Sequence, residues 1–164
     1  MELLKSILSS EITRNIGVFI GILVAVVSVW SAKVTARKKQ TADFLFASRT
    51  DSKLIDGNKC LSELHVSDDK NMRSFANRAK FDTEENINIR YVLNHYERIA
   101  VGIQAGIYDE GMLKKTSCNS VLRLYKQAKP FIDGVRDSEG VLTYYQEFEW
   151  LAKKWERSPL KTKR

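Results

Sequence analysis

Four polar residues near the middle of the sequence have types and spacings that could do chemistry. Asn94 and Glu97 are one helical turn apart, and Asp109 and Glu110 follow together at the next corner of the chain. Carboxylate and amide side chains of this kind can carry out acid–base catalysis or bind a divalent cation. An enzyme that uses Glu97, Asp109 and Glu110 is therefore one interpretation of the sequence.

A structural role is the stronger interpretation of the same residues. Asp109 suits the N-cap of a following helix, and Asn94 or Glu97 could join two helices through Arg123 or Arg136. Active sites generally bring together more convergent groups than these. We therefore predict no catalytic residue and one structural polar motif, made up of Asn94, Glu97, Asp109, Glu110 and Arg136.

Cysteine and histidine are too scattered to predict a metal site. The chain has two of each, Cys60, His65, His95 and Cys118, without the close pairs that anchor zinc. They are better explained as reduced residues of a cytosolic domain. No phosphate-binding loop, dinucleotide fingerprint or hydrolase motif occurs either. We predict no metal and no cofactor.

A long apolar segment dominates the N-terminal part of the chain. Residues 15–32 are uncharged, and most of them are strongly apolar. As a helix they would reach about 27 Å, close to the thickness of the hydrocarbon layer of a membrane. A core helix of this length would normally show a polar face, and this segment shows none. We predict a transmembrane helix over residues 15–32.

Four cations, Lys33, Arg37, Lys38 and Lys39, directly follow the apolar segment and predict its orientation. Lysine and arginine near a span tend to stay in the cytoplasm, so the N-terminus should lie outside the inner membrane and the rest of the chain inside. A cleaved signal peptide is the main alternative, but its basic end would precede the apolar run. The same cations are expected to contact anionic lipid headgroups.

Small residues form one face of the predicted span. Helical spacing aligns Gly17, Gly21, Ala25, Ser28 and Ala32, a pattern that lets two helix backbones approach closely. This face predicts a homo-oligomer, although glycine and alanine are common in any membrane helix.

The remaining segments divide into an N-terminal piece, a body and a tail. Residues 1–14 form either a short interfacial helix or an extension of the span, and residues 158–164 form a basic disordered tail. Residues 33–157 should form the cytoplasmic domain. Most of the excess positive charge lies near residue 33 and at the C-terminus, and the body itself is almost neutral. A nucleic-acid partner is therefore unlikely, because it would require a basic face on the body.

Apolar spacing predicts that the body is a bundle of four to six helices, so the fold class is all-α. A first helix should leave the membrane and present Ala47, Leu54, Leu61 and Leu64. Ser67-Asp68-Asp69 should cap a short amphipathic helix that carries Met72, Phe75, Ala76 and Ala79. Asp82-Thr83-Glu84-Glu85 should begin the longest core helix, which presents Ile89, Val92, Leu93, Tyr96, Ile99, Ala100 and Ile103 and ends near Gly106.

The C-terminal part predicts two further helices and one short turn between them. Asp109 should cap a helix that carries Leu113, Val121, Leu124, Tyr125 and Ala128. Pro130 should restart the chain in a short turn before a break at Ser138-Glu139-Gly140. The last helix should present Leu142, Tyr145, Phe148, Leu151, Ala152 and Trp155 and end at Pro159.

The segment from Tyr91 to Glu110, with Leu93-Asn94, Glu97 and Gly106-Ile-Tyr-Asp109, resembles an uncharacterised family of bacterial and phage proteins. The resemblance covers about residues 15–157 and includes Pro130-Phe-Ile and the final Tyr145…Trp155 segment. Members of this family, catalogued as domain of unknown function 4760, look like single-span proteins with a helical cytoplasmic domain. The resemblance implies this architecture and transfers no catalytic residue.

These observations favour a membrane-anchored interaction or regulatory protein over an enzyme. The expected partners are anionic lipid at the cytoplasmic face and either a second copy of the chain or another protein. The resemblance to phage proteins adds a role in phage–host conflict as an association without a physical argument.

Overall fold

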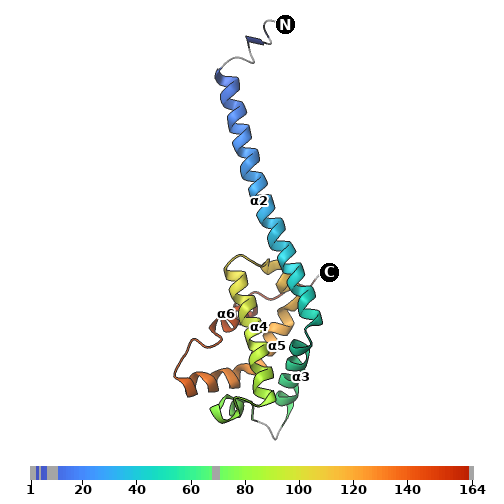
Figure 1. Ribbon diagram of the computed structural model, residues 1–164, viewed down its shortest axis with the longest axis vertical. Helices are drawn as coiled ribbons and strands as arrows, with labels where there is room; N and C mark the ends of the chain where they lie inside the picture. Colours follow the sequence, from blue (N-terminus) through green and yellow to red (C-terminus); the bar gives the residue numbers. More distant parts are fainter. Residues whose placement is uncertain (1–2, 4, 7–10, 68–70, 163–164) are drawn as a thin grey trace. The chain divides into compact units, whose positions relative to one another are not determined.

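The computed structural model describes residues 3, 5–6, 11–67 and 71–162. It divides into two units, Met1–Lys39 and Gln40–Arg164, and we describe each by itself. The described residues contain helices and turns but no strand, which confirms the all-α class (Figure 1). Residues 1–2, 4 and 7–10 of the segment 1–14 lie outside the described residues, so the interfacial-helix prediction is not tested there.

Helix α2 (Glu11–Thr50) contains the whole predicted span and continues beyond it, as expected. Its large apolar side chains from Ile16 to Trp30 are all exposed. Among the described helices it is the one that is long and apolar enough to cross a membrane. Exposed apolar surface of this extent is typical of a helix that a membrane or another protein covers, because apolar surface is unfavourable in water.

Helix α3 (Ser52–Val66) starts separately, which corrects the prediction of one uninterrupted helix. The carboxylate of Asp51 accepts a hydrogen bond from Leu54 N at 3.0 Å and ends α2 by capping α3. Leu54, Leu61 and Leu64 are buried as predicted. Ala47 lies on α2 and is exposed, because the break turns α3 out of the register of α2.

The predicted amphipathic helix over residues 72–79 is wrong. Two short 3₁₀ helices, η1 (Met72–Ala76) and η2 (Arg78–Lys80), occupy this segment. The side chains of Asn71 and Asn77 accept hydrogen bonds from the backbone two residues ahead, which breaks the segment into short turns. Ser67 ends α3 instead of starting a helix, and Asp68 and Asp69 lie outside the described residues.

Helix α4 (Glu84–Gln104) begins at the predicted signal and forms the centre of the body. Thr83 caps it by accepting from Asn86 N at 3.3 Å. All seven predicted core residues of this helix are buried, and its neighbours in contact are α3, α5 and α6. Gly106 ends the segment in the left-handed region at φ 70°, which glycine adopts without strain.

Helix α5 (Glu110–Glu139) runs through Pro130 without a break, which corrects the predicted restart. A proline inside a helix removes one backbone hydrogen bond, here the bond to the Lys126 carbonyl. Pro130 is exposed, so water can reach that carbonyl, while Phe131, Ile132 and Val135 are buried and hold the helix against the core. The predicted break at Gly140 is confirmed, with φ 65° at this C-cap.

Helix α6 (Gln146–Arg157) starts later than predicted. Leu142 precedes it and is 77% exposed, so its assignment to the buried face is wrong. Tyr145 is buried but takes the N-cap position, where its φ of 56° is the one positive value for a non-glycine residue in the described chain. The remaining four predicted core residues of α6, from Phe148 to Trp155, are buried.

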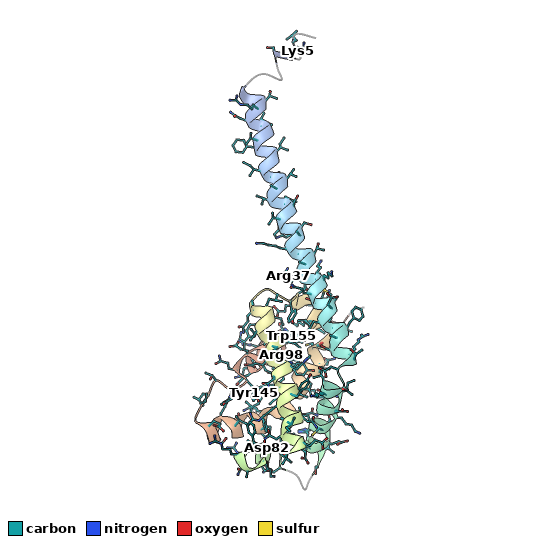
Figure 2. All side chains as sticks on the ribbon, viewed as in Figure 1. Lys5, Arg37, Asp82, Arg98, Tyr145 and Trp155 are labelled. Carbon is teal, nitrogen blue, oxygen red and sulfur yellow. The ribbon has the colours of Figure 1, made fainter. Side chains whose placement is uncertain are left out.

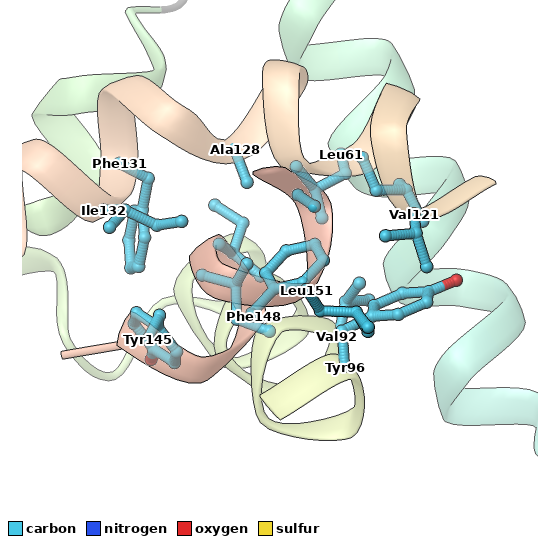
Figure 3. Close-up of a cluster of buried hydrophobic side chains, with 14 of the residues drawn as sticks. Leu61, Val92, Tyr96, Val121, Ala128, Phe131, Ile132, Tyr145, Phe148 and Leu151 are labelled. Carbon is cyan, nitrogen blue, oxygen red and sulfur yellow. The ribbon is translucent and has the colours of Figure 1, made fainter. Parts of the chain in front are cut away.

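The core of the body lies between α3, α4, α5 and α6 (Figure 3). Aromatic rings occupy much of it: Tyr96 stacks on Phe148 with ring centroids 5.2 Å apart, and Tyr125 meets Phe148 edge to face. Two glycines permit close helix packing. A Cβ at Gly57 would lie 2.6 Å from Val92 Cγ2, and a Cβ at Gly134 would lie 2.7 Å from Ala76 Cβ.

Candidate functional site

Glu97 is the structurally most informative residue of the predicted polar motif. Its carboxylate accepts hydrogen bonds from Glu147 N at 3.3 Å and Phe148 N at 2.7 Å, the free amides at the start of α6. It therefore caps a helix to which it does not belong, in place of the absent side-chain cap of Tyr145. Burial raises the pKa of Glu97, and the two amide hydrogen bonds only partly oppose this.

Arg136 joins helices as predicted, but through a different partner. Its Nη1 lies 2.6 Å from Glu149 Oε2, and its Nε donates to the Tyr144 carbonyl at 3.0 Å. Lys153 also pairs with Glu149, at 2.5 Å. Burial alone would raise the pKa of Glu149, but hydrogen bonds from Lys153 and Arg136 outweigh it and lower the pKa to about 2.

Asp109 and Glu110 hold a second junction of helices. Asp109 accepts from Met112 N at 2.9 Å, which confirms the predicted N-cap, and its own amide donates to Thr41 Oγ1 at 2.7 Å. Glu110 accepts from Lys154 Nζ at 2.7 Å and from Trp155 Nε1 at 3.1 Å. Burial raises the pKa of Glu110, but these bonds outweigh it and leave the pKa below its ordinary value.

The three carboxylates of the alternative enzyme reading do not form one cluster. Glu97 binds the first turn of α6, whereas Glu110 binds its last turn, about 11 Å further along that helix. Within the described residues no group of three histidine, cysteine or carboxylate side chains could hold a metal ion. The geometry gives each of Glu97, Asp109 and Glu110 a structural partner.

The cysteines and histidines also lie apart. His95 is buried and stacks on Phe44 with ring centroids 5.2 Å apart, and burial lowers its pKa to about 4. Cys118 is buried on α5, Cys60 is half-buried on α3, and His65 is exposed.

A polar cleft of about 480 Å³ lies beside Glu97. Arg90, Asn94 and Glu97 line it from consecutive turns of α4, and four residues of the segment 141–145 line its other side: Val141, Thr143, Tyr144 and Tyr145. We call residues 141–145 the α5–α6 loop. Asn94 is exposed in this cleft, and Arg90 donates to Asn86 Oδ1 at 2.8 Å.

The α5–α6 loop presents apolar side chains from a fixed backbone. Val141, Leu142 and Tyr144 are 43%, 77% and 37% exposed. The loop is bounded by left-handed residues, Gly140 and Tyr145, and tied to Arg136 through the Tyr144 carbonyl. Tyr145 anchors it, since its ring lies in the buried cluster (Figures 2 and 3). Strain at Tyr145 costs about 1–3 kcal/mol and persists only because the surrounding contacts hold it.

Sequence reasoning found part of this site and missed the loop. The sequence predicts Asn94, Glu97 and Arg136 as members of a polar motif, and they flank or line the cleft. It predicts Leu142 and Tyr145 on a helix face, because their apolar spacing fits one. No local pattern signals a left-handed tyrosine, because this conformation depends on Glu97 capping α6 from another helix.

The small-residue face of α2 is open within its unit. A Cβ at Gly17 or Gly21 would meet no other atom within 4 Å. Further along, Ser28 and Ala32 line a shallow hollow together with Val27, Ser31, Thr35 and Ala36. Three of the four predicted headgroup cations, Lys33, Lys38 and Lys39, are exposed, and Arg37 is half-buried.

The fold and site together define an all-α protein with an apolar N-terminal helix and a helical body whose polar clusters join its helices. The chain belongs to the family described as a domain of unknown function (DUF4760), whose model matches residues 15–155. This confirms the family resemblance found in the sequence. No curated protein and no solved structure matches the chain.

Proposed function

We propose that the protein is a single-pass, membrane-anchored interaction or regulatory module of the inner membrane, with its body in the cytoplasm. The apolar part of α2 supports the anchor, because its side chains are exposed all around the helix. Lys33, Arg37, Lys38 and Lys39 support the orientation and would contact anionic lipid headgroups.

The exposed, fixed α5–α6 loop is the observation that carries the interaction role. Leu142 and Tyr144 project from a loop that needs no large rearrangement, so a partner would lose little conformational entropy in ordering it. The adjacent cleft adds Arg90 and Asn94 as polar groups beside this apolar surface. Aromatic and arginine side chains of this kind are enriched in protein interfaces.

Photo-crosslinking in native membranes tests this role. A photoreactive amino acid at position 142 should give a discrete crosslinked partner band, and the band should fade when Tyr144→Ala is added. The matched control places the same amino acid at Ile87, which is 57% exposed on α4. Equal crosslinking from positions 142 and 87, or none from either, would contradict the proposal.

We also propose self-association through Gly17, Gly21, Ala25, Ser28 and Ala32. The open glycines and the hollow beside Ser28 support it, because neither is filled by this chain. Gly21→Ile should abolish a membrane two-hybrid signal, whereas Val26→Ile on the opposite face should leave it intact. An unchanged signal from Gly21→Ile would contradict self-association through this face.

A role in phage–host conflict is the finer form of this proposal, and its support is the resemblance to phage proteins. Expression in a bacterial host should lower the plating efficiency of at least one phage in a panel. Leu142→Ser should restore plating if the loop carries the interaction. Equal plating with and without the protein across the panel would argue against this role.

A further inference from the structure

The body has one end where the chain both enters and leaves. Thr41, the second residue of this unit, is fully buried and accepts from the Asp109 amide, and Phe44 packs on Tyr108 with ring centroids 4.9 Å apart. The loop before α5 therefore lies at the point of entry. The Lys114 ammonium group donates to the carbonyl oxygen and to the hydroxyl oxygen of Ser158. The C-terminal segment therefore lies at the same end of the body.

We define the entry face by five exposed residues of the segments that meet at this end: Ile107, Lys115, Arg157, Leu160 and Lys161. Ile107 and Leu160 are 46% and 44% exposed, and the other three residues are exposed cations. The neighbouring carboxylates of Asp109 and Glu110 are held by Met112 N and by Lys154 and Trp155, whereas Asp43 and Glu156 are exposed carboxylates in the same segments. The entry face thus combines apolar side chains with positive charge, the composition of surfaces that bind anionic membranes.

Chain length limits how far Thr41 can lie from Lys33, whatever the arrangement of the two units. Thr41 is eight residue steps beyond Lys33, which is about 12 Å of helix and at most about 27 Å of extended chain. This upper limit on the distance from Lys33 to Thr41 follows from the number of residues alone.

We propose that the entry face docks on anionic phospholipid headgroups, with Leu160 and Ile107 entering the headgroup layer and the cations facing phosphate. This inference rests on the proposed membrane anchor. Docking would turn the α5–α6 loop away from the membrane, because α5 runs about 44 Å from Glu110 to Glu139 and the loop follows its far end.

The test compares two exposed leucines in the full chain. Leu160→Cys and Leu142→Cys, each in a Cys60→Ser, Cys118→Ala background, are labelled with an environment-sensitive fluorophore. Each is reconstituted into vesicles of phosphatidylcholine alone or mixed with phosphatidylglycerol. The label at 160 should shift to the blue with phosphatidylglycerol, and the label at 142 should not. Lys115→Glu with Lys161→Glu should remove this lipid-dependent shift, and Lys126→Glu, an exposed lysine further along α5, should keep it.

Vesicle flotation separates the two ways in which the idea can fail. If the chain floats with the vesicles but the label at 160 behaves like the label at 142, docking is wrong and the anchor stands. If the chain does not float, both the anchor and the docking are wrong. A shift at 160 that survives the double charge reversal would also overturn docking on anionic lipid.

Discussion

At the scale of single residues, carboxylates connect the helices of the body. Glu97, Glu110 and Glu149 each bind a group on a different helix or a cation beside it. Each bond satisfies a polar group that packing would otherwise leave without water. Helix ends and ion pairs thus explain four residues of the predicted polar motif, Glu97, Asp109, Glu110 and Arg136, whereas Asn94 is exposed in the cleft.

Glu97→Ala should lower the free energy of unfolding by about 1–2 kcal/mol, because it leaves two amides of α6 without their acceptor. Glu97→Gln should lose less, since its amide oxygen can still accept one of these bonds. Urea unfolding of the full chain in mild detergent, followed by tryptophan fluorescence, measures both. Wild-type stability of Glu97→Ala would rule out the capping role.

Glu149 should make the free energy of unfolding depend on pH in the acid range. Its pKa is about 2 in the folded chain against an ordinary 4.5, so the folded state binds fewer protons between these values. The stabilisation is present above pH 4.5 and is lost as the pH falls toward 2. Because the ion pairs of Glu149 are partly solvated, we expect them to contribute about 1–2 kcal/mol to the free energy of unfolding at neutral pH.

Unfolding midpoints measured across this range should therefore change less for Glu149→Gln than for the wild type. Glu156→Gln, which alters an exposed carboxylate of the same helix, is the control and should follow the wild type. Parallel pH profiles for Glu149→Gln and the wild type would contradict the assignment.

At the scale of elements, apolar periodicity predicted the helices whose buried faces are long. It placed the core residues of α4 and the start of α4 at Thr83 correctly. It failed where a local side-chain cap or a contact from another helix decides the boundary. Examples are the break at Asp51, the Asn71 and Asn77 turns, and the late start of α6. The predicted restart at Pro130 was wrong, because the buried residues that follow it outweigh the low helix propensity of proline.

Gly57→Ala should destabilise the contact between α3 and α4. Alanine favours a helix by about 1 kcal/mol over glycine, but its Cβ would lie 2.6 Å from Val92 Cγ2 and 3.0 Å from the Asn88 carbonyl oxygen. We expect a net loss of about 1–2 kcal/mol in the free energy of unfolding. Lys53→Ala, on the exposed face of α3, should lower the free energy of unfolding by less than about 0.5 kcal/mol.

A double-mutant cycle with Val92→Ala sharpens this test. Removing Val92 Cγ2 takes away the closest of the two contacts, so the combined loss should be smaller than the sum of the single losses. Strict additivity, or a stabilised Gly57→Ala variant, would show that the glycine is not required for packing.

At the scale of the whole molecule, the two units have different proposed tasks. The apolar helix would anchor the chain and pair with a second copy, and the body would present the α5–α6 loop to a partner. The long apolar helix of the first unit could be predicted from the sequence, because an uncharged apolar run is a local signal. The loop depends on contacts between α4, α5 and α6, which no local pattern contains.

The most direct test of the anchored topology combines alkaline extraction with protease accessibility of the full chain in bacterial cells. The protein should remain in the membrane pellet after carbonate treatment. The body should be protected in intact spheroplasts and digested only after they are lysed. Release into the supernatant would contradict the anchor, and digestion of the body in intact spheroplasts would contradict its cytoplasmic location.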